Sequence, residues 1–301
     1  MKCRSICLLV VVGSLVAASA NAGNLYLTND PSIFRTALDG TGSVSLTSSA
    51  GVEGIAIDLA NGRMYWTSGT QVHRANLDGS ASSSIVSGLS NSLNITVDSA
   101  NGKIYWTDET ASKIQRANLD GSVVQDLVTG LSKPVGIGLD VPSGKIYWTD
   151  EGTFKVQRAN LADGTGIQDL VTGLSKPVGL DLDLAAGHIY WGDQVLGKIQ
   201  RSNLDGTSVT DVVASGAGAV LAVELDVFGG KVYWTDDDTG AVRRANLNGT
   251  GVEVLPPVAF HLAVVPEPAI PEPAIPTLSA WGTLLLGSGL LALAAVKRRA
   301  L

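Results

Sequence analysis

Residues 145–161, KIYWTDEGTFKVQRANL, contain the motif that decides the fold, because versions of it return along most of the chain. The Tyr-Trp core has five intact copies and a degenerate first one, with tyrosines at Tyr26, Tyr65, Tyr105, Tyr147, Tyr190 and Tyr233. Successive tyrosines are 39, 40, 42, 43 and 43 residues apart. A nearly constant period of this length indicates a repeat architecture, in which each unit packs against its neighbours.

Each unit contains four short strand patterns separated by turns. After the Tyr-Trp strand comes an Arg-Ala-Asn strand, then an apolar stretch such as residues 125–128, and then an alternating strand such as residues 135–140. Gly-Leu-Ser-Lys-Pro and Pro-Ser-Gly stand between them, which is turn chemistry. No stretch of the repeats has a useful helical period. A unit of about 40 residues with four strands is typical of a propeller blade, so we expect an all-β, six-bladed β-propeller over residues 23–265.

The two ends of the repeat region complement each other. The chain enters on the Tyr26 strand, which is the second strand of its blade, and no inner strand precedes it. The final segment, residues 259–265, aligns with inner strands such as residues 180–183. We therefore expect a C-terminal strand to close the first blade, which leaves no open sheet edge between the two ends.

These units resemble the YWTD, or LDL-receptor class B, repeats, a family that forms six-bladed propellers. The resemblance covers nearly all of the repeat region and departs from the motif at Leu27, Asn29, Ser68 and Gly192. The Tyr and Trp of each motif alternate along a strand, so they are expected to fill the spaces on its two sides. The following Asp is expected to accept backbone N–H bonds where the strand ends.

Residues 1–22 have the pattern of a secretory signal peptide. Lys2 and Arg4 form a basic start, residues 6–18 are apolar, and residues 20–22 form a small-residue cleavage site. An anchor that is retained is the alternative. Both cysteines, Cys3 and Cys7, lie in this segment, so the exported part would contain none.

The other end has the pattern of a sorting signal. Residues 266–276 form a Pro-rich linker, and an uncharged stretch at 274–296 is long enough for a single C-terminal transmembrane helix. Lys297, Arg298 and Arg299 follow it, which puts the main body outside the cytoplasm. Residues 275–301 resemble an IPTL-CTERM signal, which is similar to PEP-CTERM tails; its motif residues are Ile275, Pro276, Thr277, Leu278, Trp281 and Gly282. This resemblance implies a Gram-negative cell envelope and an exosortase-type sorting machinery, and leaves open whether the tail is cleaved or kept.

Charge excludes one class of partner and suggests another. The formal net charge is −7, which argues against nucleic acid. The loops from second to third strand carry acidic residues in four units: Asp108, Glu109, Asp150, Glu151, Asp193, Asp236, Asp237 and Asp238. We expect these loops to form an acidic face that binds an unknown envelope or extracellular protein, because the YWTD family uses this face for partners. The plainer alternative is that acidic turns keep an exported protein soluble. Few aromatic residues lie outside the motif, so an electrostatic contact is favoured over an apolar one.

A second hypothesis places chemistry in the central channel. Two layers of inner-strand residues should face it, Gly54, Asn94, Gly136, Gly179, Ala222, His261 and then Ala56, Thr96, Gly138, Asp181, Glu224, Ala263. Asp181, Glu224 and His261 fall on consecutive units and are candidate ligands for a divalent metal, as in a lactonase-like hydrolase. A structural matrix component is the third possibility. Because the sequence has no nucleophile elbow, Walker loop or HExxH motif, we predict a non-enzymatic binding or surface module without a cofactor.

Overall fold

The computed structural model of the protein describes residues 23–29 and 31–266. This part of the chain contains no helix and has 22 strands in five sheets. Three of the four-stranded sheets are β10 (Pro134–Asp140), β11 (Lys145–Asp150), β12 (Lys155–Asn160), β13 (Gln168–Val171); β14 (Pro177–Asp183), β15 (His188–Asp193), β16 (Lys198–Asn203), β17 (Thr210–Val213); and β18 (Val220–Asp226), β19 (Lys231–Asp236), β20 (Ala241–Asn246), β21 (Glu253–Val258). The other two sheets are not built from four consecutive strands.

One of these sheets joins the two ends of the repeat region. It consists of β22 (His261–Val265), β1 (Asn24–Asn29), β2 (Ser32–Ala37) and β3 (Val44–Ser48). In it β22 pairs antiparallel with β1, so that Thr28 lies opposite His261 and Tyr26 opposite Ala263. The predicted pairing between the C-terminal strand and the first unit is therefore confirmed.

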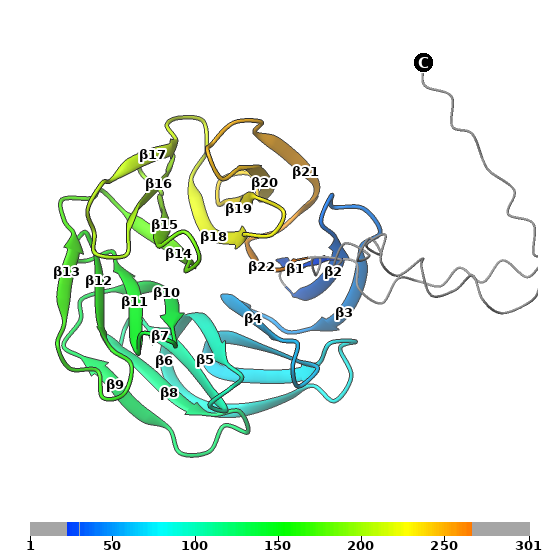
Figure 1. Cartoon of the computed structure of the whole chain (residues 1–301). Helices are drawn as coiled ribbons and strands as arrows, with labels where there is room; N and C mark the ends of the chain where they lie inside the picture. The colour runs from blue at the N-terminus through cyan, green and yellow to red at the C-terminus, as the bar shows by residue number, and fades with distance from the viewer. Residues whose placement is uncertain (1–22, 30, 267–301) are drawn as a thin grey trace, which may run out of the picture. The chain divides into compact units, whose positions relative to one another are not determined.

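The last sheet has six strands, β4 (Gly54–Asp58), β5 (Arg63–Asn76), β6 (Ser83–Asp98), β7 (Lys103–Asp108), β8 (Lys113–Asn118) and β9 (Gln125–Thr129). The inner strands β4, β6, β10, β14, β18 and β22 each contact the next, and β22 contacts β4, which closes a ring. Figure 1 shows the sheets standing around this ring like the blades of a propeller.

The prediction of six separate four-stranded blades is wrong, because the second and third repeat units share the sheet β4–β9 and leave five sheets in all among the described residues. Ser92 joins the two units. It lies opposite Gly69 of β5 on one side and Asp108 of β7 on the other, and its hydroxyl donates to the Gly69 carbonyl over 2.8 Å. In the next two units this position is Pro134 and Pro177, and proline has no N–H to donate.

The second unit also lacks the longer loop that joins the second and third strands of the later units. Its connection is two residues shorter than in the later units, and Ser68 replaces the motif aspartate. Within β5 the ring of Trp66 stacks on that of His73, with 5.2 Å between centroids. Residues seven apart on a straight strand lie about 23 Å apart, so β5 reverses direction near Gly69, which has a φ of 55°.

The predicted C-terminal segments fall outside the described residues. The transmembrane stretch at 274–296 and the sorting motif at 275–282 both lie there, as does the signal peptide at 1–22. Among the described residues, no helix is long and apolar enough to cross a membrane. The corrected fold is an all-β propeller of five sheets, with no helix in its described part.

The motif tyrosines and tryptophans pack between successive units, as predicted. Each core cluster joins the Tyr of one unit to the Trp of the next: Tyr26 with Trp66, Tyr65 with Trp106, Tyr105 with Trp148, Tyr147 with Trp191, and Tyr190 with Trp234. The remaining cluster joins Tyr233 to Leu27 of the degenerate first copy. All these side chains are buried, so the Tyr-Trp pair is a structural feature of the ring.

The motif threonine connects neighbouring sheets. The Thr149 hydroxyl accepts the Gly136 N–H of its own sheet over 2.8 Å and donates to the Val178 carbonyl of the next sheet over 2.8 Å. Thr107 and Thr235 donate in the same way to the inner strands that follow them. These bonds tie the second strand of one unit to the start of the next inner strand.

Candidate functional site

The predicted acidic residues lie at one end of the propeller, which we call the loop face. There the loops from second to third strand meet the connections that lead into the inner strands. Asp108, Asp150, Asp193 and Asp236 are all buried at this end. Asp150 accepts the backbone N–H groups of Ser132, Lys133 and Thr153 over 2.9, 3.2 and 2.9 Å. Half of the predicted binding residues are therefore loop anchors, as expected for the motif aspartate, and do not form a surface.

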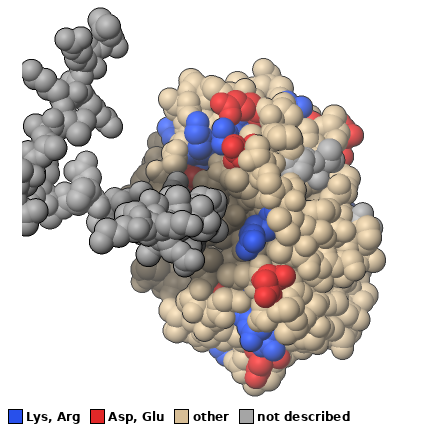
Figure 2. Space-filling view, turned by 90° about the vertical axis from the view of Figure 1, so that its right-hand side faces the viewer, with Lys and Arg blue, Asp and Glu red and all other residues tan. Residues whose placement is uncertain are grey.

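The other four predicted residues reach the surface, but lysines accompany two of them. Lys133 lies 3.4 Å from Glu109 and 4.0 Å from Glu151, and Lys176 lies 3.8 Å from Glu151. Asp237 and Asp238 are exposed, and Asp237 accepts a hydrogen bond from Gln194. The loop face therefore carries an alternating row of charges. Mixed charge also marks the side of the propeller in Figure 2, where Lys, Arg, Asp and Glu are interspersed among uncharged residues.

The loop face also exposes apolar side chains that sequence reasoning missed. Phe154, on the loop between β11 and β12, is 47% exposed. Val195 and Leu196, on the corresponding loop of the neighbouring sheet, are 68% and 49% exposed. The sequence could have identified Phe154, since it occupies a position that small residues, Ser112, Gly197 and Gly240, hold in other units. All four residues have a left-handed backbone, with φ between 55° and 65°.

The second predicted site, the channel, contains a central cavity of about 510 Å³. All six residues of the second predicted layer line it: Ala56, Thr96, Gly138, Asp181, Glu224 and Ala263. Leu59, Ser99, Val141, Leu184 and Pro266, which follow the inner strands, also line it. The cavity therefore opens at the end of the propeller opposite the loop face, where turns join inner strands to second strands. We call this end the turn face.

The first predicted layer forms a constriction and does not line the cavity. A Cβ atom on Gly136 would lie 2.6 Å from the Leu180 nitrogen, and one on Gly179 would lie 2.5 Å from the Val223 nitrogen. Neighbouring inner strands thus approach too closely for a side chain at Gly136 and Gly179. His261 belongs to this layer, and its Nδ1 is buried without a partner among the described residues. Burial lowers the pKa of its imidazole to about 4.

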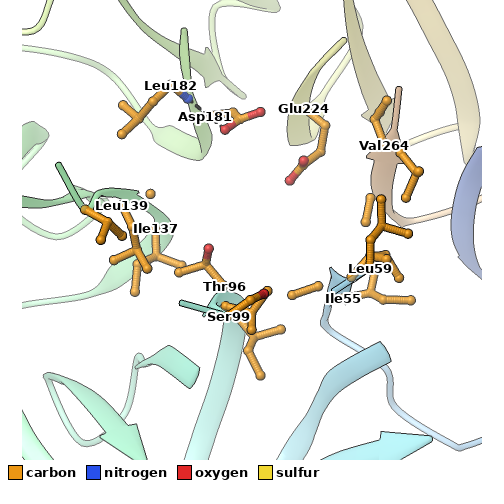
Figure 3. Close-up of a pocket in the computed structure, with 18 of the residues that line it drawn as sticks. Ile55, Leu59, Thr96, Ser99, Ile137, Leu139, Asp181, Leu182, Glu224 and Val264 are labelled. Atoms are coloured by element: carbon orange, nitrogen blue, oxygen red, sulfur yellow. Dashed lines mark hydrogen bonds between the residues drawn. The ribbon is translucent and has the colours of Figure 1, made fainter. Parts of the chain in front are cut away.

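Asp181 and Glu224 extend from β14 and β18 into the same space, as Figure 3 shows. The Asp181 carboxylate accepts the N–H groups of Leu182 over 2.7 Å and of Leu225 over 2.9 Å. Burial nevertheless raises its pKa to about 6. Burial also raises the pKa of Glu224 well above its ordinary value, and the nearby Asp181 charge raises it further. No lysine, arginine or histidine lines the cavity to balance these carboxyl groups.

The three candidate metal ligands are not brought together. Asp181 and Glu224 line the cavity, whereas His261 lies in the constricted layer and does not. Among the described residues, no group of three His, Cys, Asp or Glu side chains is placed to hold a metal ion. A divalent metal in the channel thus has only two of its three predicted ligands in reach.

A second set of repeated aspartates escaped the sequence prediction. Each ends an inner strand at the turn face and is buried: Asp58, Asp98, Asp140, Asp183 and Asp226. Their carboxylates accept backbone N–H bonds within the turn, as Asp140 does from Ser143 over 3.0 Å. Recurrence of an aliphatic residue followed by Asp was the signal that could have identified them.

Comparisons with known proteins bear on the fold. No protein-family model matches the chain, and no curated protein matches it. A chain from a nidogen–laminin complex is 25% identical, with 81% of this chain and 98% of that one covered and a TM-score of 0.74. A putative TolB from Agrobacterium tumefaciens is 15% identical, with 78% and 88% covered and a TM-score of 0.62. Virginiamycin B lyase from Staphylococcus aureus is 16% identical, with 78% and 85% covered and a TM-score of 0.59. By its strand order and by these similarities, the chain is a β-propeller.

Proposed function

We propose that this propeller is a non-catalytic binding module that holds a protein partner on its loop face. The observation that carries the proposal is Phe154. Its backbone has a φ of 61°, and a bulky residue in the left-handed region costs about 1–2 kcal/mol. Because the ring is 47% exposed, packing within the chain recovers little of that cost. An aromatic side chain kept in a strained and exposed position is explained by contact with a partner.

The surroundings of Phe154 fit a protein interface. Val195 and Leu196 add apolar surface on the neighbouring loop, and the row Glu109, Lys133, Glu151, Lys176 adds paired charges of both signs. Protein interfaces combine an apolar centre with a polar rim in this way. The similar chain in the nidogen–laminin structure belongs to a complex between two proteins, which also favours a protein partner.

The proposed location is the cell envelope of a Gram-negative bacterium. It rests on the sequence alone, through the signal peptide pattern at 1–22 and the sorting motif at 275–282. An exosortase-type machinery would then be a second, transient partner of the C-terminal segment. Fractionation of cells that express the full chain, beside a variant lacking residues 275–301, tests this location.

The binding role is tested by replacing Phe154 with glycine. We expect Phe154→Gly to keep or raise the free energy of unfolding, since glycine adopts a positive φ without strain. We expect the same change to weaken partner binding by about tenfold or more, as for loss of an interface anchor. The assay is cross-linking in cell envelopes from a photoreactive residue at position 195 on the neighbouring loop, in chains with Phe or Gly at position 154. Position 228 is the control, because Phe228 is 72% exposed at the turn face.

Equal cross-linking from positions 195 and 228 would contradict a partner site on the loop face. A Phe154→Gly variant that loses stability but binds normally would assign the ring a structural role instead. The two outcomes are separable, because unfolding and cross-linking are measured on the same variants.

A further inference from the structure

The central cavity is a built site that the proposed binding role does not use. Many of its lining residues are aliphatic, among them Leu139, Leu182 and Val264, and the surface that faces the cavity is as polar as it is apolar. The polar side chains that line it are Thr96, Ser99, Asp181 and Glu224. The Ser99 hydroxyl already donates to Asp58 at the turn face over 2.8 Å, so its hydrogen is not available to a ligand. The cavity therefore combines aliphatic side chains with two carboxyl groups.

These carboxyl groups have no cationic partner. The structure assigns Glu224 no hydrogen bond or ion pair with any described residue, and Asp181 is bonded only to backbone N–H groups. Charges in apolar surroundings are costly unless an opposite charge or hydrogen bonds compensate them. A ligand that brings one positive charge would supply that compensation, and Glu224 has both carboxylate oxygens free to accept from it.

A bare divalent ion fits the cavity poorly. Such ions take six or more oxygen ligands, or a tetrahedral set of nitrogen and sulfur atoms. Both oxygens of Asp181 already accept backbone hydrogen bonds, and His261 lies outside the lining. The aliphatic walls would face the remaining hydration shell of the ion. The same walls fit the apolar part of an organic molecule, and the volume of about 510 Å³ lies in the range of small-ligand sites.

The entrance is apolar as well. Leu59 and Leu184 line the cavity where it meets the turn face, and both are exposed, Leu59 by 58%. An apolar ligand would thus meet apolar surface before it reaches the carboxyl groups. Figure 3 shows Asp181 and Glu224 together on one side of the space, and Thr96 and Ser99 on the other. The charged part of a ligand would accordingly bind on the side of the carboxyl groups.

We propose that the central cavity binds an organic cation, in which a primary ammonium group is carried on an apolar body. Glu224 and Asp181 receive the ammonium group, and the aliphatic walls contributed by the inner strands surround the body. This site is independent of the protein partner on the loop face, because the constricted layer that contains Gly136 and Gly179 lies between the two ends.

The test is calorimetric titration of the full chain with 2-phenylethylammonium. Two matched probes accompany it: 2-phenylethanol, which lacks the charge, and methylammonium, which lacks the apolar body. We expect the full ligand to bind at least about tenfold more tightly than either probe, since a charge-assisted hydrogen bond and buried apolar area each contribute that much. Affinity should fall from about pH 8 to about pH 5 for the ammonium ligand and stay constant for the alcohol, because protonated carboxyl groups no longer attract the cation.

Two variants complete the design. Glu224→Gln keeps the shape and should weaken 2-phenylethylammonium about tenfold or more while leaving 2-phenylethanol unchanged. Asp238→Asn removes the same formal charge from the exposed loop face and should change neither affinity. Thermal unfolding of each variant verifies its fold, and loss of an uncompensated carboxyl group should not destabilise the Gln variant. Equal binding of the ammonium and the alcohol would overturn the proposal. So would an equal effect of the two variants, or no binding at about 10 mM, where even millimolar affinity is visible.

Discussion

At Asp150 a single side chain satisfies three backbone N–H groups, those of Ser132, Lys133 and Thr153. Because the carboxylate is buried, water cannot replace it when it is removed. We expect Asp150→Ala to lower the free energy of unfolding by about 3 kcal/mol or more, since each unsatisfied buried donor costs about 1–3 kcal/mol. Urea denaturation measures this loss.

The control for that variant is Asp163→Ala. Asp163 is an exposed turn residue that accepts the N–H and hydroxyl groups of Thr165 over 3.0 and 2.8 Å. Water can take over these bonds, so its loss should be clearly smaller. Similar losses in the two variants would show that the motif aspartate does not hold the loop through buried bonds.

His261 gives the propeller a pH-dependent stability. Its pKa is about 4 in the folded chain because the imidazole is buried, whereas the unfolded chain takes up the proton near the ordinary 6.5. Below pH 6.5 the unfolded state binds more protons, so the free energy of unfolding falls as the pH drops towards 4. We expect the wild type to lose about 1–3 kcal/mol more than His261→Gln between neutral pH and 4, at about 1.4 kcal/mol per tenfold change in proton affinity.

Asp181 and Glu224 act in the opposite direction, because their raised pKa values make the folded state bind more protons. That effect is common to the wild type and His261→Gln, so it cancels in the comparison. Stability curves that run parallel for the two proteins would mean that the imidazole titrates normally in the folded chain.

At the scale of the element, the inner strands alternate between two environments. On β10, Gly136 lies in the constricted layer, and a Cβ there would meet the Leu180 nitrogen at 2.6 Å. Two residues on, Gly138 lines the cavity, and a Cβ there would meet side-chain atoms of Leu180 and Leu182, the nearest at 2.9 Å, and no backbone atom among its three nearest neighbours. We expect Gly136→Ala to cost about 1–3 kcal/mol, the usual range for overpacking, because a neighbouring backbone cannot move aside.

Gly138→Ala is the matched control on the same strand. Side-chain ends can rotate away, and alanine restricts the unfolded chain, so this change should be close to neutral. Thermal unfolding of both variants decides the matter. If Gly138→Ala lowers the free energy of unfolding as much as Gly136→Ala does, the inner strands are not closest at the constricted layer.

At the scale of the whole propeller, stability depends on the pairing of β22 with β1. Leu262 is buried in a cluster with Leu25, Leu27 and Tyr233, which lie on β1 and β19. We expect Leu262→Ala to lower the free energy of unfolding by about 2–5 kcal/mol, as for other large-to-small core changes. Hydrogen exchange of the β1 amides should quicken together with that of β22, because the two strands share their hydrogen bonds.

Val254→Ala is the control for ring closure. Val254 lies on β21 and is largely exposed, so its truncation should change little. Slow exchange in β1 after the Leu262 change would show that the N-terminal strand is held without its C-terminal partner.

Much of the fold could be predicted because each repeat unit carries the same packing residues at the same positions. The burial of the Tyr-Trp pairs and the loop bonds of the motif aspartate were predicted from the motif. The pairing of residues 259–265 with the first unit was predicted from their alignment with the inner strands. The number of sheets could not be predicted in this way. It depends on Ser92, a single residue that pairs with strands on both sides where the next two units have proline.

The candidate sites were predicted less well, because exposure is not encoded in residue type. The eight acidic residues look alike in the sequence, yet four are buried anchors and two lie beside lysines. The predicted channel layer was correct for Asp181 and Glu224, since alternation along a strand is a local property. His261 obeys the same alternation but lies one layer away, where only the approach of neighbouring strands decides what reaches the cavity.

By itself, then, the sequence determined the repeated unit, its strands and the residues between units, because those depend on local periodicity and on recurring apolar contacts. It also determined the closure of the ring, since the unpaired first strand and the final strand complement each other. Only the tertiary structure decided which charges remain exposed, where the carboxyl groups lack a partner and where Phe154 lies. Those properties depend on distances between residues about 40 or more positions apart, which no local pattern records.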